Sequence, residues 1–253
     1  MSTGRQTPPP RLRSKVSAQE RALITDAVGP LADDRLVRAV RDGRGREFQR
    51  LEFLGDSVLD LVLAAHRWVE PTCRACRDAP QVASDRHLAQ VARAAGLGAW
   101  LEWDASDDRV ADLVETCVAA AWLTGRWPRA VGFAARVVHP LGDATGRLLA
   151  AGGQSLPPGR EARRVGAAVL ELAAASGLFD ALVLADEGEL SRRRALLHDA
   201  DQVAARARQR LQVGGDVETV VSRVEDALAA QLADAGADAA LTAARPLLGF
   251  AGG

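Results

Sequence analysis

The 253-residue chain carries 32 basic and 33 acidic side chains, a formal net charge of −1, so strong nonspecific attraction to nucleic acid is not expected. Apolar residues make up 48% of the sequence and aromatic residues only 4%, and no apolar run reaches the roughly 18 to 20 uncharged residues that a membrane span needs. A chain of this length can bury one or two ordinary cores, which argues against disorder over most of it.

Almost all of the basic side chains are arginines. Lys15 is the single lysine, which leaves 31 arginines among the 32 basic residues. A GC-rich coding sequence explains most of this preference. Because the planar guanidinium group matches phosphate oxygens, a nearly neutral chain can still present local phosphate-binding faces.

Cysteine use and the amino-terminal sequence indicate the compartment. The chain has three cysteines, Cys73, Cys76 and Cys117, and no signal-peptide pattern. Few cysteines without an export signal are typical of a reducing cytoplasm. We therefore expect a cytoplasmic protein that does not cross a membrane.

Residues 1–16 differ in pattern from the rest of the chain. Three consecutive prolines, Pro8 to Pro10, stand beside basic residues, which is typical of a disordered basic tail. From Ala18 onward Ala, Leu and Val recur with helical spacing and no segment alternates convincingly like a strand, so the sequence predicts an all-α fold. Glycine, proline and acidic clusters predict helix breaks near residues 29–30, 42–45, 71–80, 96–98, 104–108, 140–142, 152–159, 177–188 and 214–215.

Two segments of the chain recur with the same order and separation. A shift of 111 positions lays residues 50–61 over residues 161–172. After a one-residue gap, residues 112–125 lie over residues 222–235. This recurrence predicts tandem copies of one helical domain, with coincidental periodicity of Ala and Leu as the alternative.

Two acidic pairs have spacings that matter on helices. Glu52 and Asp56 are i, i+4 neighbours and Asp112 and Glu115 are i, i+3 neighbours, so each pair projects from one helix face. Acidic pairs on helices are usually solvated surface, but here apolar residues of core type surround both pairs. If the two helices pack side by side, four carboxylates meet. Such crowding favours a hard cation, Mg²⁺ or Mn²⁺.

Three stretches of the sequence are similar to motifs of a known family. RLEFLGDSVLDL at residues 50–61 closely resembles ERLEFLGDSVL, the signature of the ribonuclease III catalytic domain. DLVETCVAAAWLTG at residues 112–125 resembles the second acidic motif of that family, and residues 84–101 resemble the stretch between the two motifs. The resemblance implies an all-helical nuclease domain that binds Mg²⁺, acts as a dimer or internal pseudodimer, and hydrolyses phosphodiesters in double-stranded RNA.

The resemblance also assigns roles to the four acids. Glu52, Asp56, Asp112 and Glu115 fall on the metal-binding positions of the family. Asp56 and Glu115 are the residues expected to be catalytic. The implied cofactor is Mg²⁺, with Mn²⁺ as a substitute.

The second half of the chain keeps part of the same pattern. Residues 185–204 resemble the family segment EGxLSxLRaxLVsnxxLA. We expect a catalytic domain at residues 17–141 and a degenerate copy at residues 142–253, forming an internal pseudodimer, with a homodimer of chains as the alternative. Only the last of the four acidic positions remains acidic in the second copy, which has Arg163, Ala167, Ser222 and Glu225 there.

Several departures from the family pattern leave alternatives open. Gln49 replaces the glutamate that opens the signature, and the shorter residues 71–83 stand where the first copy would carry the EGxLS segment. Nothing resembles a double-stranded-RNA-binding domain, so affinity must come from the catalytic body or a partner. The alternatives to a nuclease are a noncatalytic RNA-binding or scaffold protein that retains the fold, and a helical metal phosphohydrolase acting on small substrates.

A second metal site is an alternative reading of the cysteines. Cys73 and Cys76 form a CxxC pair, and His66 and His87 flank it, so the four residues could complete a Cys₂His₂ zinc site. A CxxC pair without a second one is a weak signal. Cys117 lies among core positions and is expected to be a buried, small apolar residue.

Overall fold

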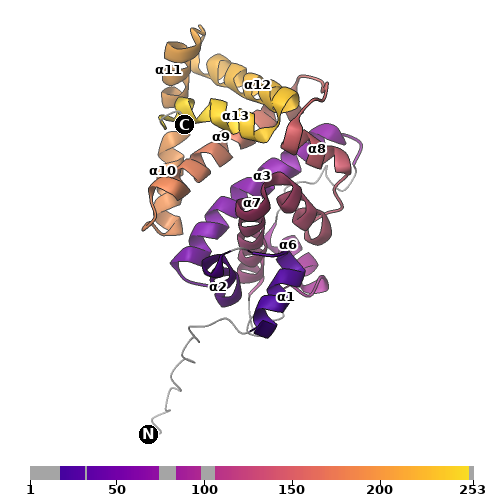
Figure 1. Cartoon of the computed structure of the whole chain (residues 1–253). Coiled ribbons are helices and arrows are strands. Elements are labelled where there is room, and N and C mark those ends of the chain that lie inside the picture. Colours follow the sequence, from indigo (N-terminus) through magenta and orange to yellow (C-terminus); the bar gives the residue numbers. More distant parts are fainter. Residues whose placement is uncertain (1–17, 32, 74–83, 98–105, 251–253) are drawn as a thin grey trace.

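The structure is a computed structural model of the chain and describes residues 18–31, 33–73, 84–97 and 106–250. In this part of the chain the elements are helices and no strand occurs, which confirms the all-α prediction (Figure 1). The predicted tail at residues 1–16 lies outside the described residues. The elements are α1 (Ala18–Val28), α2 (Asp34–Asp42), α3 (Arg46–Val69), α6 (Asp85–Ala94), α7 (Asp107–Val137), α8 (Asp143–Ala151), α9 (Arg160–Ala181), α10 (Glu187–Leu197), α11 (Ala200–Leu211), α12 (Val217–Ala235), α13 (Ala237–Ala244) and the short 3₁₀ helix η1 (Arg245–Leu248).

Helix α3 is the centre of the molecule. It packs against α7 on one side and against α9 on another, so that side chains such as Leu51, Leu54, Val58 and Leu61 are fully buried. In Figure 1, α1, α2 and α6 lie on one side of α3, and α11 and α12 lie beyond α9. Burial of nearly the whole circumference of α3 explains its long apolar sequence.

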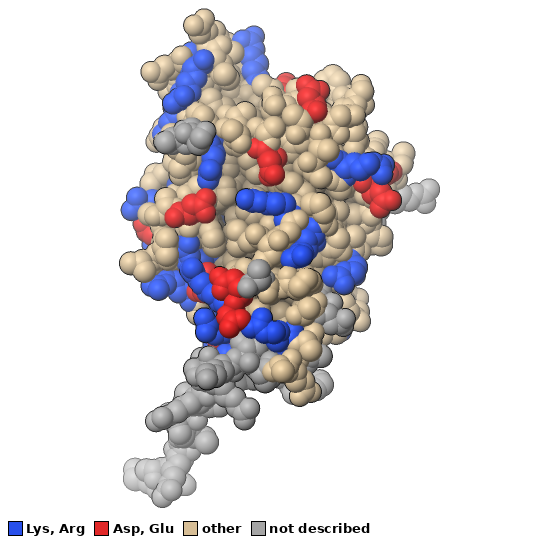
Figure 2. Space-filling view, in the orientation of Figure 1, with Lys and Arg blue, Asp and Glu red and all other residues tan. Residues whose placement is uncertain are grey.

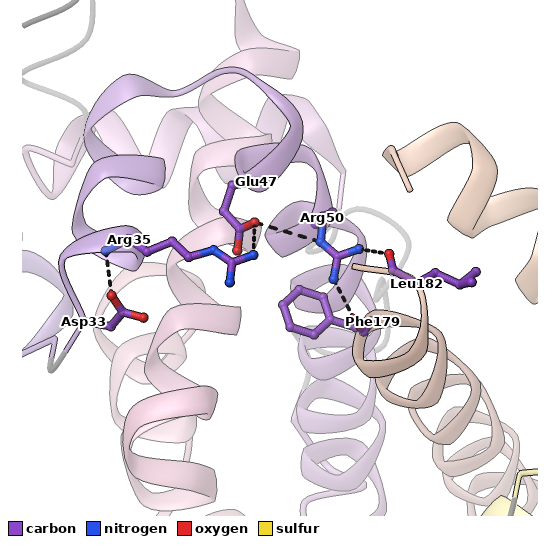
Figure 3. A network of polar contacts seen from close by, with 6 residues as sticks. All are labelled: Asp33, Arg35, Glu47, Arg50, Phe179 and Leu182. Atoms are coloured by element: carbon purple, nitrogen blue, oxygen red, sulfur yellow. Dashed lines mark hydrogen bonds and ion pairs between the residues drawn. The ribbon is translucent and has the colours of Figure 1, made fainter. Parts of the chain in front are cut away.

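Helices α3 and α9 run antiparallel. Near the start of α3, the buried Arg50 donates one hydrogen bond to the carbonyl of Leu182 and another of 2.5 Å to that of Phe179, at the end of α9 (Figure 3). At the other end of α3, Arg67 forms a 3.6 Å ion pair with Glu161 at the start of α9. The contacts at the two ends therefore fix the antiparallel direction.

Helices α7 and α12 share boundaries that are 110 positions apart. Each follows a capping residue, Ser106 or Asp216, whose side chain accepts a hydrogen bond from a first-turn amide. Each regular stretch also ends at a residue with a positive φ, Arg126 at 51° and Gly236 at 84°. The interruption thus falls at the same distance from the start of both helices.

Most predicted breaks fall at helix ends, and three details differ. The kink at Arg126 was not among the predicted breaks, although the helix-breaking residues Gly125 and Pro128 lie beside it. Pro128 begins the next helical segment without needing an amide partner. The break between α10 and α11 at residues 198–199 was also missed. Conversely, α9 continues through Gly177. A Cβ there would lie 2.5 Å from the Phe250 ring, so this glycine makes room for the ring and does not mark a helix end.

Two further expectations concern burial and membranes. Cys117 is a free cysteine with 0% exposure, which confirms the prediction of a buried apolar residue, and burial raises the pKa of its thiol well above the ordinary range. Among the helices described, none is long and apolar enough to cross a membrane.

Candidate metal centre

The two acidic pairs meet where α3 crosses α7. A Cβ on Gly55 would lie 1.9 Å from the carbonyl oxygen of Glu115, so the two backbones are in direct contact at this glycine. Nearby, the buried Thr116 hydroxyl donates a 3.4 Å hydrogen bond to the carbonyl of Phe48. The absence of a side chain at Gly55 is therefore what allows the acids of α3 to stand beside those of α7.

Three of the four predicted ligands form one cluster. Glu52, Asp112 and Glu115 are half-buried, and each offers a carboxylate oxygen that lies within 4.8 Å of the others. In an octahedral Mg²⁺ site with metal–oxygen distances of about 2.1 Å, ligand oxygens are about 3 to 4 Å apart. The carboxylates fit such a site after small side-chain movements, and their oxygens are the hard donors that Mg²⁺ prefers.

The cluster is electrostatically strained. Burial, together with the charges of Asp56, Asp112 and Glu52, raises the pKa of Glu115 to about 9. Burial and the neighbouring acids also raise the pKa of Glu52 to about 7 and that of Asp112 to about 6. A bound cation would remove this repulsion, so the arrangement favours binding of a divalent metal ion.

Asp56 lies beside the cluster and not within it. Its carboxylate forms a 3.4 Å ion pair with Arg194 of α10. The same guanidinium donates a 2.9 Å hydrogen bond to the hydroxyl of Ser57 and lies 4.9 Å from the centre of the Phe53 ring. Burial raises the pKa of Asp56 while the charge of Arg194 lowers it. The second half of the chain thus supplies a counter-charge to the first.

Two acidic residues near the cluster were not identified from the sequence. Glu187, in the first turn of α10, raises the pKa of Glu52 and of Asp112 by its charge. Asp85, in the first turn of α6, acts in the same way on Asp112 and Glu115. The resemblance of residues 185–204 to the EGxLS segment could have indicated Glu187, whereas nothing in the spacing indicated Asp85.

The crossing of α9 and α12 repeats the backbone geometry without the acids. A Cβ on Gly166 would lie 2.0 Å from the carbonyl oxygen of Glu225. Burial raises the pKa of Glu225, and the charge of Arg163 lowers it. Arg163 stands at the sequence position that corresponds to Glu52, so an arginine provides the positive charge here and no carboxylate cluster forms among these residues.

The structure groups residues around Cys73 that differ in part from those of the predicted zinc site. His66 and Cys73 do lie together, but the third residue within reach is His139. The ring of His87 faces the carbonyl of Val138 at 3.4 Å. Cys76 lies outside the described residues. Among the described residues His139 therefore takes the place expected for His87, and the sequence did not indicate it because His139 is 66 positions from Cys73.

The fold and the acidic cluster define an all-helical protein with a candidate centre for a hard divalent cation. No protein-family model matches the chain. Over 90 residues the chain is 34% identical to "Ribonuclease 3" of Pseudothermotoga lettingae. The aligned part comprises 30% of this chain and 38% of the length of that relative. A part of the chain is therefore ribonuclease III-like.

Proposed function

We propose that the chain is an endoribonuclease of the ribonuclease III type, which hydrolyses phosphodiester bonds in double-stranded RNA with Mg²⁺ or Mn²⁺. The observation that carries this proposal is the convergence of Glu52, Asp112 and Glu115 at the contact between α3 and α7. These residues stand in the two stretches that resemble the acidic motifs of the family. The partial similarity to a ribonuclease 3 supports the same class of reaction.

In this proposal the carboxylates act as ligands and orienting groups. A bound Mg²⁺ would supply an activated water and stabilise charge on the leaving 3′ oxygen. Glu52, Asp112 and Glu115 would hold the cation, and Glu115, whose pKa is raised to about 9, would release its proton on binding. Asp56 joins the centre when Arg194 turns from it to a phosphate, for which the guanidinium fork is suited.

We also propose that residues 17–141 and 142–253 are two copies of one domain that form an internal pseudodimer. The equivalent glycine crossings and the shared interruption of α7 and α12 support this proposal. The contact of Trp127 with Asp238 adds to it, because the indole N–H donates a 3.0 Å hydrogen bond between nearly equivalent positions. Contacts of that kind are expected close to a twofold axis. One half would then hold the competent centre.

Recognition of the duplex should depend on its shape and not on base sequence. Figure 2 shows arginines interleaved with acidic side chains over the visible face, without one continuous basic surface. The net charge of −1 agrees with this distribution. Affinity would then come from local arginines and from metal ions that bridge carboxylates to phosphates. A cytoplasmic location would suit such RNA processing.

The ion pair between Asp56 and Arg194 favours a second candidate, a noncatalytic RNA-binding protein. An arginine that holds one of the four acids competes with a metal ion for it. The exposed Gln49, one helical turn before Glu52, removes a further acid from the same region. In this alternative the protein binds duplex RNA and does not cleave it.

Incubation of the purified chain with a long RNA duplex tests the proposal, with Mg²⁺, with Mn²⁺ and with chelator in parallel. Cleavage with either metal and none with chelator is expected, and a single-stranded RNA of the same sequence should remain intact. Duplex binding measured by fluorescence anisotropy separates the candidates. Binding without cleavage in any metal would support the noncatalytic protein and contradict the nuclease.

A further inference from the structure

A second cluster of metal-binding side chains lies at the far end of α3 from Arg50. His66 is in the last turns of α3, and Cys73 lies in the turn that follows that helix. His139 lies directly after α7, where its amide donates a hydrogen bond of 3.1 Å to the carbonyl of Ala134. Three segments far apart in sequence thus place two imidazoles and one sulfur together.

The spacing of the three groups is close to that of a tetrahedral metal site. Their ligand atoms all lie within 4.8 Å of one another. The sulfur of Cys73 is 3.4 Å from Nε2 of His139. With zinc–sulfur and zinc–nitrogen distances of about 2.3 and 2.05 Å, a tetrahedral angle separates these two atoms by about 3.6 Å. The separation of these two atoms therefore matches one edge of a tetrahedral site.

His66 has an unsatisfied ring nitrogen. His66 is 3% exposed, and its Nδ1 lies 3.0 Å from the hydroxyl of Thr145 on α8. Nε2 is buried without a hydrogen-bond partner. If Nδ1 donates to Thr145, Nε2 keeps a lone pair without a donor in the interior, which is costly unless a cation accepts it. A metal-bound histidine usually donates its other ring N–H to a hydrogen-bond acceptor, and the Thr145 hydroxyl can take that role for His66.

The protonation of the two imidazoles also suits a cation. Burial and the charge of His139 lower the pKa of His66, and burial and His87 lower the pKa of His139. A lowered pKa favours the neutral imidazole, which is the form that binds metal ions.

We propose that His66, Cys73 and His139 bind a Zn²⁺ ion that joins the end of α3 to the end of α7. Imidazole and thiolate donors favour zinc over the hard Mg²⁺ expected at the carboxylates. Cys73 is disulfide-bonded in the structure, so the site forms after reduction. A dithiol or phosphine reduces the disulfide by supplying two electrons. Each sulfur takes up one proton, which yields two thiols and the oxidised reductant. Binding of zinc then releases the proton of the Cys73 thiol.

Titration of the reduced, metal-free full-length chain with Co²⁺ is the first test. Co²⁺ takes zinc sites and gives a thiolate charge-transfer band in the near ultraviolet and intense visible bands when it is tetrahedral. We expect both, saturating near one Co²⁺ per chain and displaced by Zn²⁺. Mg²⁺ in excess should leave the bands unchanged. A folded, reduced chain without a thiolate band would overturn the proposal.

Variants assign the ligands. Cys73→Ser should remove the thiolate band, and Cys117→Ala is the matched control that should keep it. Retention of the band by Cys73→Ser would also overturn the proposal. Because Cys73 lies in a turn and is half-buried, its substitution should leave the fold intact, which circular dichroism checks.

A milder change tests the supporting contact. Thr145→Val keeps the shape of the side chain and removes the hydroxyl beside His66. We expect zinc affinity to fall roughly 10- to 100-fold, the range seen when support of a metal-bound histidine is lost. Unchanged affinity in this variant would exclude His66 as the supported ligand, whereas Glu115→Gln should leave zinc affinity at the wild-type value.

Discussion

The α3–α7 pair and the α9–α12 pair cross in the same way and differ in the charges at the crossing. Gly55 and Gly166 each bring their helix against the backbone of a glutamate, Glu115 or Glu225. Around the first crossing stand carboxylates whose pKa values are raised to between about 6 and about 9. Around the second, Arg163 faces the remaining acid.

This difference separates what packing requires from what chemistry requires. Both crossings have a glycine, because a Cβ at this position would push the two helices apart whether or not acids surround the crossing. The cluster of carboxylates stands at the first crossing only, and binding of a metal ion there would offset the repulsion among them. The glycine therefore reflects helix packing, and the carboxylates reflect the proposed metal chemistry.

The largest effect that we expect from the difference between the two crossings is on the pattern of RNA cleavage. With one competent centre, a monomeric chain should cut a single strand of a duplex at each binding event. Strand-specific end-labelling of the two RNA strands, on protein shown to be monomeric by light scattering, measures this. Efficient paired cuts by the monomer would contradict the assignment of one centre.

Substitution of the two crossing glycines tests whether the halves are equally packed. Gly55→Ala and Gly166→Ala should each lower the free energy of unfolding by about 3 kcal/mol or more, because the new methyl overlaps a backbone carbonyl. Gly132→Ala on α7 is the control. Nothing lies within 4 Å of its Cβ, so stability should rise by about 0.5 to 1 kcal/mol. Denaturant unfolding in which one crossing tolerated alanine would show that the crossings are not equivalent.

Arg50 joins the halves, and its loss should have the next largest effect. Arg50→Ala leaves two carbonyls at the end of α9 without their donor and removes a cation–π contact of 4.6 Å with Phe179. We expect a loss of about 2 to 4 kcal/mol in chemical unfolding. Arg46→Ala, at an exposed position of α3, should change stability by less than about 0.5 kcal/mol. Equal small effects would show that Arg50 does not hold the interface.

The pH dependence of stability should be smaller and should come from the first crossing together with Asp60, whose pKa is raised to about 7 by burial. A carboxyl whose pKa is raised on folding keeps a proton that the unfolded chain releases, so stability in chelator should fall as the pH rises from about 5 to about 9. Glu115→Gln should raise stability near pH 8 by about 1 to 2 kcal/mol, or roughly 2 to 8 °C in the unfolding midpoint. Glu225→Gln should raise stability near pH 8 by a smaller amount. Scanning calorimetry at several pH values measures both, and a pH-independent midpoint would contradict the crowding of the acids.

Local sequence predicted much of this architecture. The i, i+4 and i, i+3 spacings of the acids predicted their common faces, and Glu52, Asp112 and Glu115 do lie together. The apolar periodicity predicted helices, and glycines and prolines predicted most of their ends. These features depend on residues within one or two helical turns of each other.

Features that depend on distant contacts could not be predicted. The pairing of Asp56 with Arg194 joins residues 138 positions apart, and Arg50 reaches the end of α9 across 132 positions. The positive φ of the kink is at Arg126, which is not glycine, so the neighbouring Gly125 and Pro128 indicate a break nearby but not its position. The division into domains at residues 141 and 142 remains a prediction, since α8 contacts helices of both halves.

Cleavage by two matched glutamine variants tests the central claim most directly. Glu115→Gln and Glu225→Gln make the same chemical change at equivalent crossings of the two halves. With Mg²⁺ and a long RNA duplex, Glu115→Gln should lose more than roughly a hundredfold in rate, beyond the usual effect of changing a residue that only supports a metal ligand. Glu225→Gln should cleave at the wild-type rate. Equal losses in the two variants, or a loss in Glu225→Gln alone, would contradict the account that one half carries the metal centre.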